Sequence, residues 1–329
     1  MKLKAAALGI LAATLLSACG GTTPTSTPSA DAPASEGAKK AVKIGIAQIV
    51  THPALDAVAA GFKDALKEAG YEVTYSEENA QGDQATLSSI ASTFASSDND
   101  GYLAIATPTA QALANAITDK PIVFAAVTDP VAAGLMKDWD KPDANLTGVS
   151  DLNPMKEQLE LIKEALPEAK TVGIVYSSGE VNSEVQVAEA EKAAGDLGLE
   201  IKKATVTNSS EVQQAADSLD VDALLVPTDN TVVSAAESVI QIGEQKQIPV
   251  FASDESTVER GAAAGLSVNY TQQGKDAAAI MIKLLDGTPA SEIPVETQKE
   301  FDLFVNPEMG KKQGLELSEA IVSRATKQF

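Results

Sequence analysis

The chain has 329 residues, of which 44% are hydrophobic and 22% charged, and its formal net charge at pH 7 is −21. Such an acidic chain repels nucleic acids and anionic lipid headgroups, so we expect neither as a partner. The one cysteine and the one histidine, Cys19 and His52, leave no disulfide framework and no cysteine-based metal site. We expect no metal and no cofactor.

The N-terminus has the layout of a secretory signal. Two lysines precede an apolar run over residues 5–16, which is too short to span a bilayer, and "LSAC" follows. A buried N-terminal helix is the alternative, but no polar face interrupts the run. "LSAC" (16–19) resembles the bacterial lipobox, in which the cysteine is lipidated and becomes the new N-terminus. We therefore predict a signal peptide over residues 1–18 and lipidation of Cys19, with a free structural cysteine as the alternative.

The next segment predicts a tether. Residues 20–40 are almost entirely Gly, Thr, Pro, Ser and Ala with a few charges, so they have little to bury. We assign residues 19–41 to the lipidated cysteine and a disordered linker. No later apolar stretch reaches membrane-spanning length.

From residue 42, short apolar runs alternate with longer amphipathic ones. The first cycle predicts strands at 42–48, 72–77, 101–106 and 121–127, with helices at 53–70, 83–96 and 108–117 between them. A second cycle predicts helices at 154–166, 182–198, 209–219 and 231–245, and strands at 170–177, 200–206, 222–227 and 248–253. Alternation of this kind indicates parallel strands buried on both faces.

The two cycles open on similar runs, "AVKIGIAQ" at 41 and "AKTVGIVY" at 169. Together with the repeated order, this predicts an α/β fold of two Rossmann-like lobes with parallel sheets. The last 75 residues supply one strand (264–269), one helix (271–287), an extended "FDLFVN" and a C-terminal helix, too little for a third core. We therefore assign 42–150 plus 256–288 to the first lobe and 151–255 plus 289–329 to the second.

Polar side chains gather where the predicted strands end, which is where open α/β sheets bind ligands. In the first lobe these ends carry Gln48, the loop to His52, "ATPTA" (106–110) and "VTDP" (127–130). In the second they carry "YSSGEVNS" (176–183), "PTDN" (227–230) and "ASDES" (252–256), and "TGVSDLNP" (147–154) lies between the lobes. His52 is a candidate for a catalytic base, a cleft wall or a structural loop residue.

"ATPTA" has a mechanism for binding an anion. Thr107 can cap a helix and Pro108 suits its first position, so the next backbone N–H groups face outward. Such a terminus favours an α-carboxylate, although an ordinary capped helix has the same sequence.

Four aspartates, Asp129, Asp151, Asp229 and Asp254, lie at or near predicted strand ends. Turn and cap chemistry accounts for any one of them alone. Four around one cleft suit a ligand with both a carboxylate and an ammonium group. Only one or two would then pair with the ammonium, because several unpaired buried carboxylates are costly.

Missing motifs exclude several enzyme classes. The sequence has no G-x-S-x-G, G-x-x-x-x-G-K-[ST], G-x-G-x-x-G or C-x-x-C. "SDNDG" (97–101) has Thr107 where a calcium loop needs its glutamate, so it is read as a turn. A Ser-His-Asp hydrolase would depend on His52, whose nearest strand-end carboxylate, Asp56, serves equally as a helix-start residue. We expect no enzymatic activity.

Taken in order, "QIVTHPALDAVAAGFKDAL", "AQGDQ" (80–84), "IATPTAQALA" (105–114), "AAVTDPVAAGL" (125–135), "NLTGVSDLNP" (145–154), "YSSGEVNS" and "VPTDNTVVSA" (226–235) closely resemble the substrate-binding lipoproteins of ABC importers for tryptophan and tyrosine. The resemblance covers essentially the whole chain from about residue 42. It implies a type I periplasmic-binding-protein fold, with two lobes, a three-stranded hinge and closure over one small ligand.

The resemblance also implies the residues of the site. They are Gln48, His52, Thr107, Thr109, Asp129, Ser150, Asp151, Ser177, Ser178, Asn182, Thr228, Asp229 and Asp254. Thr107 and Thr109 are the predicted carboxylate ligands, and Asp229 or Asp129 the predicted partner of the ammonium. Tyr176 or Phe251 is predicted either to pack against an apolar ligand side chain or to belong to the core. "VNYTQQG" (268–274), with Asn269 and Tyr270, departs from the family pattern, so the ligand preference can differ if this segment edges the cleft.

The function implied is that of a monomeric, lipid-anchored extracytoplasmic binding protein. It would capture an aromatic amino acid and deliver it to an ABC permease with its ATPase. The alternative is a ligand-sensing lipoprotein of the same fold for another small amino acid or polar solute.

Overall fold

A computed structural model describes residues 40–142 and 144–329 of the chain. The predicted signal peptide, the lipidated Cys19 and the linker up to residue 39 lie outside the described residues. Within the described ranges, each helix is too short or too polar to cross a membrane.

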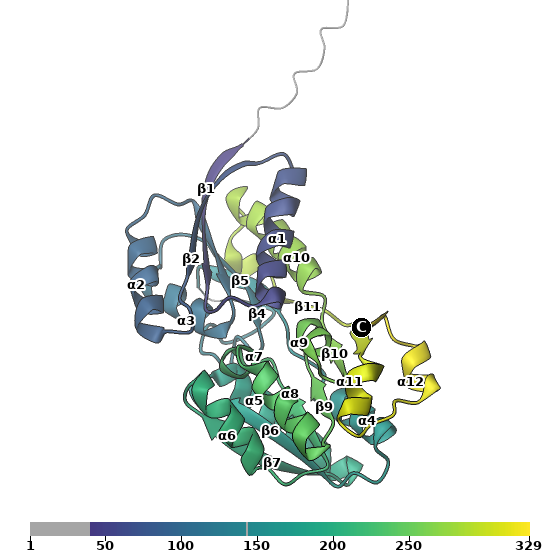
Figure 1. Cartoon of the computed structure of the whole chain (residues 1–329). Coiled ribbons are helices and arrows are strands. Elements are labelled where there is room, and N and C mark those ends of the chain that lie inside the picture. The colour runs from purple at the N-terminus through teal and green to yellow at the C-terminus, as the bar shows by residue number, and fades with distance from the viewer. Residues whose placement is uncertain (1–39, 143) are drawn as a thin grey trace, which may run out of the picture. The chain divides into compact units, whose positions relative to one another are not determined.

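Strands and helices alternate along the described chain (Figure 1). The strands are β1 Ala41–Gln48, β2 Glu72–Asn79, β3 Gly101–Ile105, β4 Ile122–Val127, β5 Leu146–Ser150, β6 Thr171–Ser177, β7 Glu200–Val206, β8 Ala223–Val226, β9 Val250–Ala252, β10 Ala264–Ser267, β11 Glu296–Thr297, β12 Asp302–Val305 and β13 Lys327–Gln328. The α-helices are α1 Pro53–Glu68, α2 Gln84–Ala95, α3 Thr107–Ala116, α4 Met155–Ala165, α5 Val181–Ala194, α6 Val212–Ser218, α7 Asn230–Val233, α8 Ala236–Lys246, α9 Glu255–Arg260, α10 Tyr270–Leu285, α11 Pro307–Lys312 and α12 Glu319–Ser323. Short 3₁₀ helices cover Gly195–Leu197, Ser209–Glu211 and Ala290–Glu292.

The strands form two sheets with the same core order. The first sheet runs β11-β5-β4-β3-β1-β2, and all of its neighbours are parallel. The second runs β13-β12-β10-β9-β8-β6-β7 and is parallel except between β10 and β12. Counted from the first strand of each half, both sheets contain the order 2-1-3-4-5. This confirms two Rossmann-like α/β lobes with predominantly parallel sheets.

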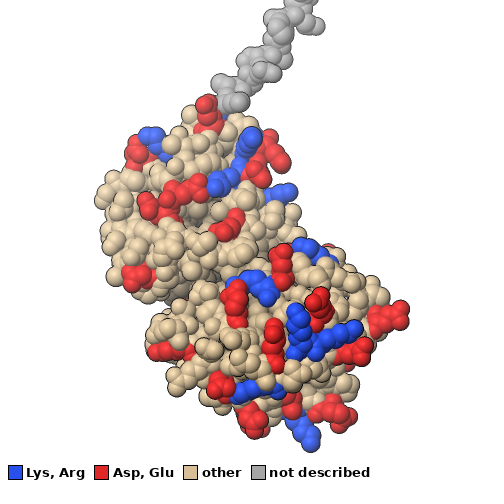
Figure 2. Space-filling view, in the orientation of Figure 1, with Lys and Arg blue, Asp and Glu red and all other residues tan. Residues whose placement is uncertain are grey.

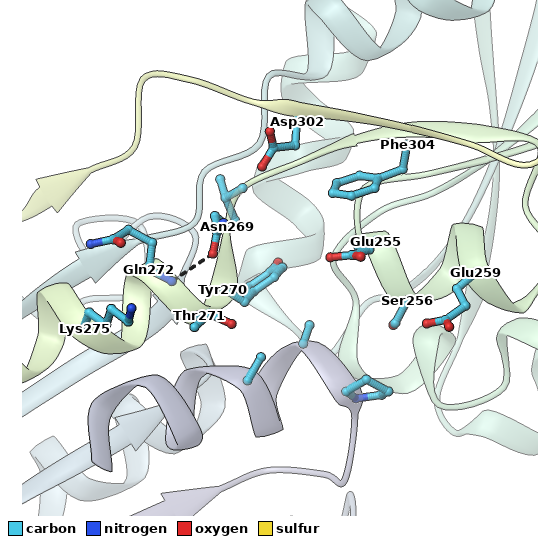
Figure 3. A pocket seen from close by; sticks show the side chains of 14 residues that line it. Glu255, Ser256, Glu259, Asn269, Tyr270, Thr271, Gln272, Lys275, Asp302 and Phe304 are labelled. Atoms are coloured by element: carbon cyan, nitrogen blue, oxygen red, sulfur yellow. Dashed lines mark hydrogen bonds between the residues drawn. The ribbon is translucent and has the colours of Figure 1, made fainter. Parts of the chain in front are cut away.

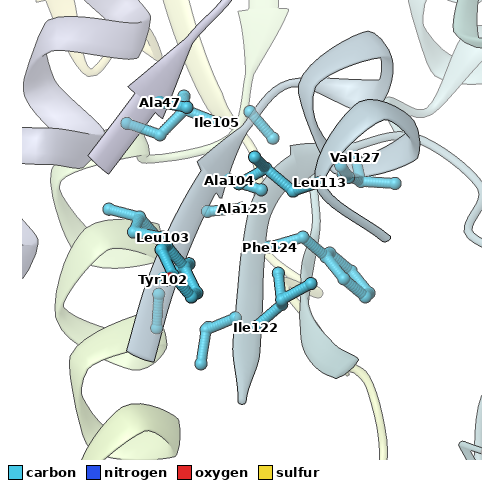
Figure 4. Close-up of a cluster of buried hydrophobic side chains, with 14 of the residues drawn as sticks. Ala47, Tyr102, Leu103, Ala104, Ile105, Leu113, Ile122, Phe124, Ala125 and Val127 are labelled. Carbon is cyan, nitrogen blue, oxygen red and sulfur yellow. The ribbon is translucent and has the colours of Figure 1, made fainter. Parts of the chain in front are cut away.

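The core of the first lobe is built on strands that are buried on both faces. All residues of β3 and β4 are buried, and Tyr102, Ile105, Phe124 and Leu113 lie in one apolar cluster (Figure 4). Two further clusters fill the second lobe. This arrangement explains why the sequence of these strands is continuously apolar rather than alternating.

Helices α1 and α10 pack closely beside the first sheet, with α2 and α3 on its other side (Figure 1). The α1–α10 contact depends on two glycines. A Cβ atom on Gly274 would lie 2.1 Å from the Val58 carbonyl oxygen, and one on Gly61 would lie 2.2 Å from the Thr271 carbonyl oxygen. The backbones therefore touch directly, which fixes the first turn of α10 relative to α1.

The chain crosses between the two sheets three times, after β5, after β10 and after β11. The predicted multi-stranded hinge is therefore confirmed, but the predicted lobe boundaries are wrong in detail. Residues 256–288 were assigned to the first lobe, whereas α9 and β10 belong to the second sheet and its surroundings. Residues 289–329 were assigned to the second lobe, whereas β11 pairs with β5 of the first sheet. β10 pairs with β9 and β12, so each sheet contains five strands from its own half of the chain.

The sequence did not predict β5 as a strand, because "LTGVS" is short and mixes glycine with hydroxyl side chains. Tertiary contacts stabilise this strand where the strand propensity of its residues is low. Thr147 Oγ1 donates to the Ile293 carbonyl oxygen (2.8 Å), and the ring of Phe124 covers Gly148. The predicted helix at 231–245 is also divided, into α7 and α8.

Charges of both signs intermix on the face shown in Figure 2. Ion pairs such as Lys327 with Glu255 (2.9 Å) and Arg260 with Glu237 (3.1 Å) join neighbouring elements of the second lobe. These pairs are solvent-accessible, and we expect each to contribute little to stability.

Candidate ligand-binding site

A cleft between the lobes lies where the strands of both sheets end. We call it the interlobe cleft, and it encloses about 390 Å³ of space, including its mouth. Its lining residues are His52, Ala54, Leu55, Ala106, Ala126, Thr128, Asp151, Asn182, Thr228, Asp229, Asn230, Val233, Asp254 and Tyr270. Each of these follows or ends a strand, or lies in the first turns of the helix that comes next. The position agrees with the rule for ligands of doubly wound sheets.

Two alanines with positive φ angles form part of the wall of the cleft. Ala106 at the end of β3 has φ 79° and Ala126 within β4 has φ 54°. Residues other than glycine adopt such angles at a cost, and they concentrate at functional sites. Gln273 stabilises the second one, because the Ala126 N–H donates to Gln273 Oε1 (3.1 Å). The wall is therefore held in a conformation that the strand alone would not adopt.

The N-terminus of α3 begins beside Ala106. Thr107 and Thr109 are buried, and neither hydroxyl oxygen has a hydrogen-bond partner among the described residues. The first N–H groups of a helix also lack intrahelical acceptors. This terminus therefore offers unused donors close to the cleft, a combination that favours an anion.

Asp229 and Glu180 are buried carboxylates whose hydrogen bonds come from their own lobe. Asp229 caps α7 by accepting from the Val232 N–H (2.8 Å), and it also accepts from the Ser183 hydroxyl (2.6 Å) and the Ser177 N–H (2.6 Å). Burial, together with the negative charge of Glu180, raises the pKa of Asp229 above its usual range. Its oxygens are already occupied, so Asp229 shapes the loop that carries Thr228.

Asp151 lies at the first crossing between the lobes and is fully buried. Its two oxygens accept from Thr128 Oγ1 (3.2 Å) and from the Tyr270 hydroxyl (3.2 Å). Burial raises the pKa of Asp151 to about 6, against the effect of these two hydrogen bonds. Burial and the Asp151 carboxylate together raise the pKa of Tyr270. The pair joins two of the three crossing segments in the wall of the cleft.

His52 ends the loop after β1 and contacts the second lobe. Its Nε2 lies 3.1 Å from Ser256 Oγ, 3.4 Å from Arg260 Nη2 and 3.8 Å from Asp254 Oδ1. Burial lowers the pKa of His52, an effect that the Asp254 carboxylate partly opposes. The serine and the aspartate face the same ring nitrogen. A catalytic triad needs them on opposite nitrogens, so this geometry does not fit a Ser-His-Asp hydrolase.

Only one of the two carboxylate oxygens of Asp254 accepts a hydrogen bond within the described residues. Its Oδ1 accepts from Ser256 Oγ (2.6 Å) and from the Thr257 N–H (2.9 Å), so it caps α9. Its Oδ2 is buried without a partner among the described residues, and so is Oδ1 of Asn182. Both residues line the cleft. An unpaired buried carboxylate oxygen is costly unless a ligand donates to it.

Six of the thirteen predicted site residues line the interlobe cleft. They are His52, Asp151, Asn182, Thr228, Asp229 and Asp254. Thr107 and Thr109 are buried at the adjoining helix terminus, and Ser177 supports Asp229 through its N–H.

The other four predicted residues have contacts elsewhere. The amide of Gln48 donates to Asp56 Oδ1 (2.8 Å) and to the Val50 carbonyl oxygen (2.7 Å). Asp129 Oδ1 accepts from the N–H groups of residues 131 and 132, which makes it a turn residue. Ser150 Oγ donates to the Thr128 carbonyl oxygen (2.8 Å), and Ser178 is exposed. Tyr176 and Phe251 belong to the core of the second lobe.

Sequence reasoning missed the apolar part of the lining. Ala54, Leu55, Ala106, Ala126 and Val233 carry no pattern that separates a cleft wall from a core. Thr128 and Asn230 lie in the motifs "VTDP" and "PTDN", beside the predicted site residues Asp129 and Asp229. Tyr270 stood in the segment "VNYTQQG", whose departure from the family pattern was the available signal.

Comparisons with known proteins agree with this geometry. The family model described as ABC transporter substrate binding protein matches residues 43–329. A curated relative, the tyrosine-binding protein of Clostridioides difficile, is 41% identical over 274 residues, 82% of this chain and 79% of the relative. The crystal structure of an ABC domain in complex with L-Trp from Streptococcus pneumoniae has a TM-score of 0.85 and 34% identity, covering 88% of this chain and 100% of that one. The type I periplasmic-binding-protein fold implied by the resemblance is confirmed.

One solved structure indicates how the lobes are arranged. The ligand-free, open structure of a substrate binding protein with adhesive properties from Clostridium difficile is 41% identical and covers 88% of this chain and 99% of that one, but its TM-score is only 0.68. The tryptophan complex has lower identity and the higher score. The described lobes therefore resemble the ligand-bound arrangement more than the open one.

Proposed function

This chain belongs to the ABC transporter substrate-binding protein family, and we propose that it captures a single amino acid, an aromatic one by preference, in the interlobe cleft. The names of two relatives support the ligand class, since one is a tyrosine-binding protein and another was solved with L-Trp. The cleft supports it through its mixed lining, which combines carboxylates and hydroxyls with Leu55, Val233 and the Tyr270 ring.

One observation carries the proposal. A buried carboxylate oxygen without a partner, Asp254 Oδ2, belongs to one lobe, and the unpartnered hydroxyls of Thr107 and Thr109 at a helix N-terminus belong to the other. An amino acid has an ammonium group for the first and a carboxylate for the second. A ligand that bridges both lobes in this way favours their closure, because it makes the full set of contacts only in the closed arrangement.

We assign the ammonium group to Asp254 rather than to Asp229 or Asp129. Asp229 already accepts three hydrogen bonds, and Asp129 does not line the interlobe cleft. Asn182, whose Oδ1 also lacks a partner, is the second acceptor. Asp151 is satisfied by Thr128 and Tyr270 and contributes shape to the wall.

The remaining features are proposed on the sequence. The chain is exported by its signal peptide, anchored through lipidated Cys19 and tethered by the linker at the extracytoplasmic face of the membrane. It acts as a monomer, passes its ligand to a membrane permease that an ATPase drives, and turns over no substrate.

Isothermal titration and thermal shift with the twenty amino acids test the ligand class. We expect L-tyrosine or L-tryptophan to bind and to raise the melting temperature. Tyramine, which lacks the carboxylate, and 3-(4-hydroxyphenyl)propionate, which lacks the ammonium group, separate the two anchors. Both analogues should bind at least about 100-fold more weakly, because each leaves a buried polar group unpaired. If no amino acid shifts the melting temperature, the proposed ligand class is wrong.

A further inference from the structure

A second hollow adjoins the interlobe cleft. It encloses about 930 Å³, including its open side, and lies among the first turns of α1, α9 and α10 and the strand β12 (Figure 3). Its polar lining includes Glu255, Glu259, Asn269, Lys275 and Asp302. Figure 3 shows Tyr270 in the middle of the lining, between Thr271 on one side and Ser256 on the other.

Two residues, Tyr270 and Ala54, line both the interlobe cleft and the second hollow. Alanine has only a methyl group, so the phenol ring of Tyr270 is the larger of the two side chains that the spaces share, and we treat it as the partition between them. Tyr270 is also nearly inaccessible to solvent, at 7% exposed. We expect removal of this ring to open a connection between the two spaces.

The partition is held rigidly. The Tyr270 hydroxyl donates to Asp151 Oδ2 (3.2 Å), and Asn269 caps α10 by accepting from the Gln272 N–H (2.9 Å). Behind the ring, the glycine contacts between α1 and α10 leave no room for the first turn of α10 to move towards α1. The position of the ring is therefore set by the packing of α10 against α1 as well as by the bond to Asp151, and the packing alone remains in a variant that lacks the hydroxyl.

We propose that the Tyr270 ring is a specificity-determining residue that limits the length of the ligand side chain, an inference that rests on the proposed amino-acid-binding function. Ala54 and Leu55, two apolar residues of the cleft lining, lie in the first turn of α1, which packs against the helix that begins at Tyr270. We place the aromatic ligand side chain at this end of the cleft. A side chain with one aromatic group fits in front of Tyr270. Amino acids that carry a further aromatic ring beyond the first are excluded, because the extension would have to enter the second hollow through the position of Tyr270.

Titrations with L-tyrosine, L-tryptophan and 4-phenyl-L-phenylalanine test this role in the wild-type protein and in the variants Tyr270→Ala and Tyr270→Phe. The wild-type protein and Tyr270→Phe should bind the biphenyl amino acid at least about 100-fold more weakly than they bind the tighter of L-tyrosine and L-tryptophan. Tyr270→Ala should reduce that ratio to below about tenfold, because the extension now has room. Tyr270→Phe is the matched control, since it loses the same bond to Asp151 but keeps the ring.

Thermal melting of each variant checks folding, and Tyr270→Leu replaces Tyr270→Ala if the latter does not fold. The leucine variant should give an intermediate ratio. A folded Tyr270→Ala or Tyr270→Leu that still rejects the biphenyl amino acid would overturn the role of Tyr270 and leave the proposed function standing, because the same titration measures tyrosine and tryptophan. Wild-type protein that binds no amino acid would overturn both.

Discussion

His52 Nε2 of the first lobe lies 3.1 Å from Ser256 Oγ of the second, and both side chains are buried. The contact joins the start of α1 to the first turn of α9, and its histidine lines the interlobe cleft. It exists only while the lobes are together, so the protonation state of the one histidine in the chain is coupled to closure.

The first prediction concerns pH. Burial lowers the pKa of His52 in the closed arrangement, whereas an open cleft would expose the ring and return its pKa towards about 6.5. The closed form therefore binds protons less well, and acid favours opening. We expect ligand affinity to fall as pH drops below about 6.5, by at most about tenfold per pH unit because one proton is involved.

The groups that face His52 are Asp254, Arg260, Asp56 and Glu237. A variant of the histidine itself isolates the contribution of the ring. His52→Gln keeps a hydrogen-bonding side chain and does not titrate. Isothermal titration between pH 5 and 8 should show a shallower slope for His52→Gln than for the wild-type protein. Parallel slopes would contradict the coupling.

The second prediction concerns the ammonium anchor. Asp254→Asn keeps an oxygen for the cap of α9 but replaces the unpartnered oxygen by an amide nitrogen, which repels a ligand ammonium group. We expect ligand affinity to fall by about 100-fold or more, because the ligand charge is left buried without its partner. Isothermal titration with L-tyrosine and L-tryptophan at pH 7.5 measures this change in affinity.

Asp83→Asn is the matched control. Asp83 caps α2 in the same way, by accepting from the Thr86 N–H (2.6 Å), but it is exposed and does not line the cleft. Its substitution should leave ligand affinity unchanged. Equal affinities for Asp254→Asn and the wild-type protein would assign the ammonium group to another residue.

The third prediction concerns Asp151 and stability. Its pKa in the folded protein is about 6, above the ordinary value of 3.8, so the folded state binds this proton more tightly than the unfolded state. The stability that this proton contributes is therefore present below about pH 4 and is lost as pH rises to about 6. The loss is on the order of 3 kcal/mol, since each pH unit between the two values contributes about 1.4 kcal/mol.

Asp151→Asn removes this titration and can keep both neighbours, because the hydroxyls of Thr128 and Tyr270 accept as well as donate. Urea unfolding between pH 4 and 8 should show the stability of the variant rising relative to wild type up to about pH 6 and staying level above it. A constant difference across this range would mean that Asp151 does not titrate within it.

The fourth prediction concerns the α1–α10 contact. Gly274→Ala places a Cβ atom 2.1 Å from the Val58 carbonyl oxygen, and backbone cannot yield as a side chain can. We expect a loss of about 3 kcal/mol or more in the free energy of unfolding, measured in urea.

Gly195→Ala is the control: its φ of −59° suits alanine and a Cβ atom there would meet nothing within 4 Å. That change should be neutral or stabilising by up to about 1 kcal/mol. Similar losses in both variants would contradict the close approach.

The sequence determined the architecture and the location of the site. Apolar runs of strand length alternated with helical patterns because parallel strands are buried on both faces, and this alternation indicated two lobes. The carboxyl ends of parallel strands meet at one edge, so the motifs after β1, β8 and β9 were expected near one another, and His52, Thr228 and Asp254 do line one cleft.

Tertiary structure decided which polar side chains face that cleft and which strand belongs to which sheet. Asp129 and Asp254 both follow a strand and both cap a turn, yet only Asp254 keeps a free oxygen in the cleft, because the direction of each loop depends on packing far along the chain. β10 stayed with the second sheet through its pairing with β9 and β12, a contact that local sequence does not encode. The contact of His52 with Ser256 spans 204 positions, and it forms because the tertiary structure brings the two lobes together.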